Sequence, residues 1–286
     1  MPKLHQSILV QANKQKIWNA IVDVSKYKVW TEVFTPGSYF EGSWQQGEKM
    51  KFLAKDKENL GGLTSVIAEN KLFKYISIQH LGLVKNGEED VTSEEAKKWA
   101  GCFENYTFVE KSSETTEFIV DVDVADGYED EIAGMWQKGL ISLKNFCEKP
   151  FEKITIQTSI NKPIQQVWKV FTKPEYITRW NFASPDWECP KAANDLQVGG
   201  RYSYVMAAKD GSFAFDFGGT YTNIEPFQHI ESILDDGRKV SVQFEEVDGN
   251  ILVTETFEAE TQNSLELQAQ GWQAILNNFA AIAMLD

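Results

Sequence analysis

Val167-Trp168-Lys169-Val170-Phe171, followed by Trp180, is the stretch on which the rest of the chain is organised. An earlier stretch, Ile17-Trp18-Asn19-Ala20-Ile21, is followed in the same way by Trp30, and each tryptophan recurs after 150 residues. Self-similarity at a fixed spacing is the signature of a repeated structural unit. The sequence therefore predicts a tandem duplication, with one unit at residues 1–150 and a second at residues 151–286.

The composition is that of a folded protein that does not bind anionic surfaces. The 286 residues are 42% hydrophobic and 13% aromatic, so each unit has enough apolar material for its own core. The net charge is −14, and both units are acidic. Because an acidic surface repels phosphate backbones and anionic lipids, nucleic acid and membrane partners are disfavoured.

Cysteine usage bears on the compartment. The chain has three cysteines, Cys102, Cys147 and Cys189. An odd number without CxxC spacing favours reduced thiols over a disulfide framework. No run reaches the roughly 18 apolar residues that a membrane-spanning helix requires. We expect a soluble, cytoplasmic protein.

Apolar periodicity gives both units the same order of elements. An N-terminal strand leads into a helix capped by Asn13 or Asn161, then into short antiparallel strands and one long closing helix. The predicted strands of the second unit cover residues 153–160, 201–207, 213–224, 229–234, 239–246 and 251–258. The closing helices are predicted at about residues 128–148 and 264–285, and they contain the matching pairs Trp136-Gln137 and Trp272-Gln273.

Residues 84–101 are where the first unit carries an insertion. Thr92-Ser93-Glu94-Glu95 has the spacing of a capping box, which predicts a short helix ending near Trp99. Two interpretations stay open. The helix flanks the mouth of a cavity with Trp99 packed inward, or it is an ordinary surface insertion.

Several motifs of the second unit together resemble a known family. They are Leu196-Gln197-Val198-Gly199-Gly200-Arg201-Tyr202-Ser203-Tyr204, Asp210-Gly211-Ser212-Phe213, Phe217-Gly218-Gly219-Thr220-Tyr221, Leu234-Asp235-Asp236-Gly237-Arg238, Val253-Thr254-Glu255-Thr256-Phe257 and Gly271-Trp272-Gln273-Ala274-Ile275-Leu276. These motifs resemble the homologues of the activator of heat-shock protein 90 ATPase, in the START and Bet v-like (SRPBCC) superfamily. The first unit is similar, but Gly47-Glu48-Lys49 replaces the Gly-Gly-Arg pattern.

The resemblance implies an α+β fold with two helix-grip domains. Each is expected to have a bent antiparallel sheet wrapped around a long C-terminal helix, two short helices after the first strand, and a cavity between sheet and helix. It does not imply one reaction, because a function belongs to a site rather than to a fold.

The second unit is dense in aromatic residues, as an apolar ligand cavity would be. Tyr202 and Tyr204 share one face of a strand, and Phe213, Phe215 and Phe217 share one face of the next. The ligand-binding candidates of the whole chain are Trp30, Trp99, Trp180, Phe182, Trp187, Tyr202, Tyr204, Phe215, Phe217, Tyr221, Leu276 and Phe279. The alternative is a solid aromatic core without a cavity, which would explain Leu276 and Phe279 equally well.

Other chemistry finds little support. His5, His80 and His229 are scattered without ligand spacing, so no metal, cofactor or catalytic residue is predicted. Gly199-Gly200 and Gly218-Gly219 lack the context of a phosphate loop and are interpreted as hairpin turns or bulges.

Three functions remain. The leading hypothesis is binding of a small hydrophobic or aromatic molecule, without catalysis. The resemblance also implies a protein-interaction module that binds a chaperone. A third possibility is an enzyme resembling polyketide cyclases, with Tyr202, Tyr204 or Tyr221 as proton donor.

Overall fold

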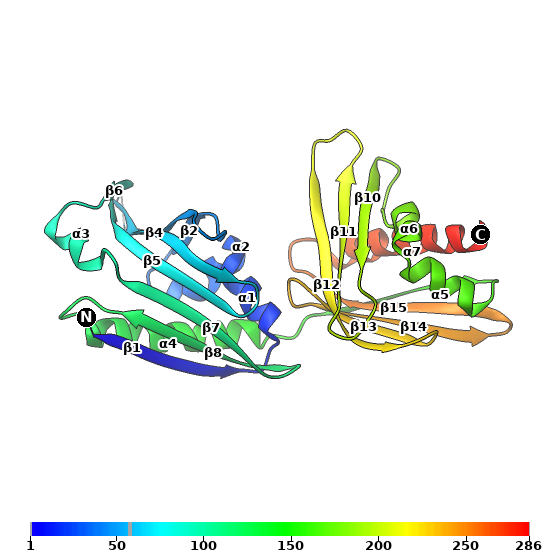
Figure 1. Cartoon of the computed structure of the whole chain (residues 1–286), viewed down its shortest axis with the longest axis horizontal. Helices are drawn as coiled ribbons and strands as arrows, with labels where there is room; N and C mark the ends of the chain where they lie inside the picture. Colours follow the sequence, from blue (N-terminus) through cyan, green and yellow to red (C-terminus); the bar gives the residue numbers. More distant parts are fainter. Residues whose placement is uncertain (1, 57–58, 286) are drawn as a thin grey trace. The chain divides into compact units, whose positions relative to one another are not determined.

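The computed structural model describes residues 2–56 and 59–285, and the chain divides into two compact units, Met1–Lys149 and Pro150–Asp286. Each unit has its own buried hydrophobic core. Figure 1 shows that each unit combines a curled sheet with one long helix. The predicted α+β fold with two helix-grip units is therefore confirmed.

The elements of the first unit begin with a strand and two short helices. They are β1 (Lys3–Val10), α1 (Lys14–Val22), α2 (Val24–Trp30), the 3₁₀ turn η1 (Thr31–Val33), β2 (Tyr39–Gly42), β3 (Lys49–Asp56), β4 (Asn59–Lys71), β5 (Tyr75–Lys85), β6 (Glu88–Asp90), α3 (Glu94–Trp99), β7 (Phe103–Ser112), β8 (Thr115–Asp123) and α4 (Glu129–Cys147). The strand order is β1-β8-β7-β5-β4-β3-β2, with β6 added beside β5.

The second unit repeats this plan. Its elements are β9 (Lys153–Ile160), α5 (Ile164–Thr172), α6 (Pro174–Trp180), β10 (Trp187–Asn194), β11 (Arg201–Ala208), β12 (Ala214–Glu225), β13 (His229–Leu234), β14 (Lys239–Val247), β15 (Asn250–Glu258) and α7 (Leu265–Leu285). The order β10-β11-β12-β13-β14-β15-β9 again places the first strand of the unit beside the last. Figure 1 shows the sheet bent between β12 and β13, with α7 (red) inside the bend.

The duplicated tryptophans have the same structural role in both units. The Trp30 indole donates a hydrogen bond to the carbonyl of Ala20 at 2.9 Å, and Trp180 donates to Val170 at 3.0 Å. These bonds tie each second short helix to the first. A buried indole N–H needs such a partner, so the repeated spacing preserves a structural contact.

Local chemistry agrees with most of the predicted element boundaries. The Asn13 side chain accepts a hydrogen bond from the Lys16 amide at 2.8 Å, as an N-cap does. Asn161 does not do so in the second unit. Pro163 holds the N-cap position of α5 without a side-chain bond, because proline already fixes a backbone angle suited to helix entry.

Candidate functional site

A cavity of about 340 Å³ lies in the second unit between the sheet and the start of α7. Its wall combines aromatic and aliphatic side chains with a small polar set. The polar members are Asn181, Ser232, Arg238, Glu255, Glu260, Asn263 and Gln268. Because a solid core would leave no such space, the alternative of an aromatic core without a cavity does not describe this unit.

The structure brings together seven of the twelve candidates at this cavity. Trp180, Tyr202, Tyr204, Phe215, Phe217, Tyr221 and Leu276 all line it. Tyr202 and Tyr204 stack with ring centroids 5.1 Å apart, as their shared strand face predicts. Phe217 lies edge-on to Trp272 of α7, 5.8 Å away, so rings from sheet and helix close the wall together.

Four candidates line neither this cavity nor the one in the first unit. Trp30 is buried in the core of the first unit, and Phe279 is buried against Phe171 and Trp180. The Phe182 backbone carbonyl accepts a hydrogen bond from the Asn278 side chain at 2.7 Å. Trp187, at the start of β10, packs against Phe213 and Phe215 at the start of β12. None of these four is among the residues that line either cavity, and their role in ligand binding stays a prediction.

Trp99 lines a separate cavity of about 400 Å³ in the first unit. It ends α3, whose first turn is capped by the Ser93 hydroxyl accepting from the Ala96 amide at 3.1 Å. Its ring lies 5.6 Å from that of Tyr128. The inserted helix therefore contributes a wall to this cavity rather than lying apart from it.

A chain of hydroxyls and amides orients the tyrosines of the second unit. Tyr204 hydrogen-bonds Tyr221, whose hydroxyl donates to Asn194 Oδ1 at 2.8 Å, and the Asn194 amide donates to the Thr172 carbonyl at 2.6 Å. Burial raises the pKa of Tyr221 to about 12. The hydroxyl therefore stays neutral and acts as a hydrogen-bonding group.

Glu255 is the carboxylate that a strand of the sheet contributes to this cavity. It lies on the inward face of β15 between the buried side chains of Val253 and Phe257, and pairs across the sheet with Val242 and Ile156. This apolar burial raises its pKa to about 7. Among residues 2–56 and 59–285, no hydrogen bond or ion pair to the Glu255 carboxylate is found.

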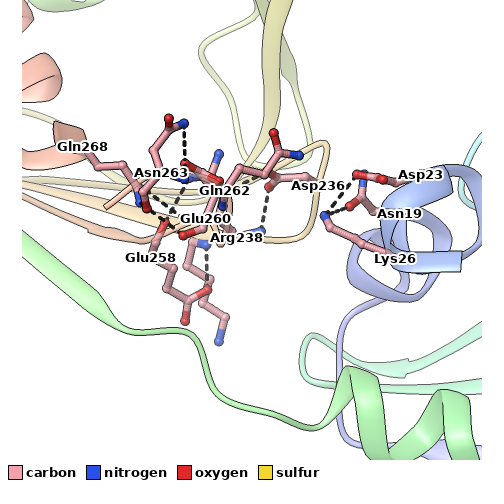
Figure 2. Close-up of polar contacts among 11 residues, drawn as sticks. Asn19, Asp23, Lys26, Asp236, Arg238, Glu258, Glu260, Gln262, Asn263 and Gln268 are labelled. Atoms are coloured by element: carbon pink, nitrogen blue, oxygen red, sulfur yellow. Dashed lines mark hydrogen bonds and ion pairs between the residues drawn. The ribbon is translucent and has the colours of Figure 1, made fainter. Parts of the chain in front are cut away.

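The neighbouring charged groups are held by other partners. Arg238 Nε donates to Asp236 Oδ2 at 2.7 Å, and its Nη1 donates to the Glu258 carbonyl at 3.1 Å. Figure 2 shows Glu260 bonded to Asn263 and Gln268, which fastens the loop after β15 to the first turn of α7. Arg238 therefore does not neutralise Glu255.

Sequence reasoning overlooked Glu255, although a signal was present. In Val253-Thr254-Glu255-Thr256-Phe257 the carboxylate takes the place of an apolar residue on the inward face of an alternating strand. Gly218-Gly219, interpreted as a hairpin turn or a bulge, lies inside β12 with no register shift at either glycine. A Cβ on Gly219 would come within 2.6 Å of the Tyr202 hydroxyl, so this glycine makes room for that ring.

A family model described as Activator of Hsp90 ATPase homolog 1-like protein matches residues 161–284. An AHSA1-like protein from Aeromonas hydrophila is 46% identical over 46% of this chain and 91% of its own, with a TM-score of 0.44. The chain belongs to the Activator of Hsp90 ATPase homolog 1-like family. The family model falls in the second unit, where it covers nearly all of the residues.

Two further solved structures are similar. A protein from Cytophaga hutchinsonii is 44% identical over 45% of this chain and 90% of its own, with a TM-score of 0.42. The di-domain ARO/CYC protein BexL of the BE-7585A biosynthetic pathway spans 99% of this chain and 98% of its own, at 15% identity and a TM-score of 0.39. At that level the likeness does not extend to activity. A comparison with curated proteins finds no match.

Within the described residues, no group of three or more His, Cys, Asp or Glu side chains is arranged to hold a metal ion. None of the helices in that part of the chain combines the length and hydropathy needed to cross a membrane.

Proposed function

We propose that the second unit binds a small aromatic molecule that carries a hydroxyl group, without catalysing a reaction on it. The observation that carries the proposal is Glu255, a carboxyl that has no hydrogen-bond or ion-pair partner among the described residues and lines a mainly apolar cavity. A buried polar group left unpaired costs free energy, and a ligand hydroxyl would supply the missing bond. Aromatic walls from Tyr204, Phe217 and Trp272 would contact the ligand ring.

The cavity size supports a ligand of one or two rings. Its volume of about 340 Å³ is at the lower end for small-molecule sites, which run from roughly 300 to 1,000 Å³. Glu255 has a pKa near neutrality, so it can either accept a hydrogen bond or donate one. A phenol, which can do both, fits this property.

Calorimetric titration with 2-naphthol tests the proposal. We expect 2-naphthol to bind more tightly than 2-methoxynaphthalene, which keeps the oxygen but has no O–H to donate. E255Q should weaken 2-naphthol binding about five- to tenfold, since a bond to a charged group exceeds one to a neutral group. E245Q, at an exposed position on β14, is the matched control. Equal binding of both compounds, or no binding by the folded chain, would reject the proposal.

A second candidate function is binding of a chaperone, and an exposed aromatic cluster favours it. Phe213 and Phe215 are 59% and 43% exposed and lie beside Trp187, with ring centroids about 6 Å apart. Exposed apolar patches often mark protein contacts. The family name directs the test to heat-shock protein 90.

The corresponding experiment is a pull-down and ATPase assay with that chaperone. On this proposal the double variant F213S/F215S abolishes capture and stimulation. V198S, at an isolated exposed valine of the same unit, should leave both intact. Absence of capture by the unmodified chain would rule the proposal out.

A further inference from the structure

The cavity of the first unit differs in chemistry from that of the second. It has a volume of about 400 Å³ and is walled by β-strands, α3 and α4. Aromatic rings make up much of the wall, among them Tyr27, Trp99 and Trp136. Among its described lining residues there is no Lys or Arg, whereas the second cavity includes Arg238.

Glu104 is the buried acid of this cavity. It lies on β7, and only 16% of its side chain is exposed. One carboxylate oxygen, Oε1, accepts a hydrogen bond from the Tyr106 hydroxyl. Within the described part of the chain the other oxygen, Oε2, has no hydrogen-bond partner; its near neighbour is His80 Nε2 at 4.0 Å.

His80 does not supply a counter-charge to Glu104. It is 2% exposed, its Nδ1 is 2.9 Å from the Ser65 hydroxyl, and burial lowers its pKa to about 4. The imidazole is therefore neutral at physiological pH. An ionised Glu104 is then a buried negative charge without a cation, which is an unfavourable arrangement unless a ligand brings the positive charge.

The aromatic rings favour the same kind of ligand. Tyr106 and Trp136 pack edge to face at 5.8 Å, and Trp99 and Tyr128 lie 5.6 Å apart. The faces of Trp and Tyr rings attract cations, and the attraction is larger where water is excluded. Glu95 of α3, exposed and paired with Lys85 at 3.0 Å, adds a second carboxylate toward solvent.

We propose that the cavity of the first unit binds a small organic cation, a protonated amine on an apolar body. The ammonium group donates a hydrogen bond to Glu104 Oε2, and the apolar body lies among Tyr27, Trp99 and Trp136. A carboxylate between aromatic faces combines charge pairing with cation–π attraction. The two units would thus have diverged to bind different ligands within one fold.

The proposal predicts a specific pH dependence. Burial raises the pKa of Glu104 to about 7, so the affinity for an amine rises as pH increases from 6 to 8, while an aliphatic amine keeps its proton. Groups facing Glu104 are Tyr106 on β7, His80 on β5 and Tyr27 on α2. Burial shifts their pKa values away from this window, downward for His80 and upward for both tyrosines. The α4 side chains at this cavity do not titrate.

Calorimetry on the full chain with phenethylamine tests the proposal. The controls are 2-phenylethanol and 3-phenylpropanoate, which keep the ring but replace the ammonium by a neutral or a negative group. We expect the amine to bind most tightly, and E104Q to weaken it tenfold or more. E255Q, which alters the second cavity, should leave amine binding unchanged.

Each other outcome overturns the proposal. Equal or tighter binding of the alcohol or the acid would show that the cavity does not select a cation. Loss of binding in E255Q but not in E104Q would place the amine in the second unit. Thermal unfolding checks that E104Q is folded, and the pH series needs no variant: a flat affinity between pH 6 and 8 also contradicts the proposal.

Discussion

Glu255 faces inward on β15, between Val253 and Phe257, where the strand would be expected to carry an apolar residue. Its burial raises its pKa to about 7, above that of an exposed glutamate, so the folded state holds the proton more tightly than the unfolded state. The stability contributed by this proton is complete below about pH 4.5 and is lost as pH rises through about 7.

E255Q removes the titrating carboxyl and with it this pH dependence of stability. We expect the variant to gain stability relative to the unmodified chain between pH 5 and pH 8, by on the order of 2–3 kcal/mol at the higher pH. Urea denaturation at the two pH values measures the difference. E245Q, at an exposed glutamate on β14, should show no such pH-dependent gain. If the free energies of unfolding of E255Q and the unmodified chain differed by the same amount at both pH values, the burial of Glu255 would be contradicted.

Single residues also show the limit of prediction from sequence. Tyr202, Tyr204 and Phe217 were predicted at the cavity because strand alternation puts them on the inward face. Glu104 and Glu255 obey the same alternation. They were overlooked because a lone carboxylate in a strand is usually solvated, and only the packed sheet shows that both side chains are largely buried.

At the scale of elements, Gly219 shows how β12 makes room for the site. A Cβ there would lie 2.6 Å from the Tyr202 hydroxyl and 2.8 Å from the Ile233 carbonyl. We expect G219A to lower stability by about 1–3 kcal/mol, as overpacking does, and to displace Tyr202. Thermal unfolding measures the loss.

The matched control is Gly271 in α7, where an added Cβ would meet nothing within 4 Å. Alanine favours a helix over glycine, so G271A should be neutral or stabilising by up to about 1 kcal/mol. If both substitutions had the same effect, the close approach at Gly219 would not matter to the fold.

One strand that the sequence did not predict contains a proline, a residue that is unfavourable in the middle of a sheet. Strand β10 is absent from the predicted strands, and it contains Pro190. The structure places β10 at the edge of its sheet, with the register shifting between Glu188 and Lys191. An edge position and a bulge are the two conditions under which proline is tolerated, and sequence alone specifies neither.

At the scale of the whole molecule, the duplication preserved the scaffold. Trp18 packs on Phe73 and Phe108, while Trp168 packs on Phe227 and Phe244. Phe73 and Phe227 share a left-handed backbone, with φ of 58° and 68°. The duplication was predictable because both copies keep the tryptophan spacing. The chemistry of the two cavities was not predictable from the duplication. Glu104 lies on β7, whereas Glu255 lies on β15, and these strands do not correspond in the order of the two sheets.

We propose that the chain can be divided between Lys149 and Pro150 into two pieces that fold alone, because each has its own core. Each piece should unfold cooperatively and keep the ligand preference of its cavity. A control piece that ends at residue 127 lacks α4, and with it the core residues Trp136, Leu140 and Leu143. It should not unfold cooperatively. Failure of both full pieces to fold would show that the units depend on each other.

A crystal structure of the chain with 2-naphthol tests the central claim most directly, because it locates the ligand in the second cavity. The account predicts the naphthalene ring among Tyr204, Phe217 and Trp272, with the ligand oxygen within about 3 Å of the Glu255 carboxylate. Ligand density elsewhere, or an empty cavity at saturating 2-naphthol, would contradict it.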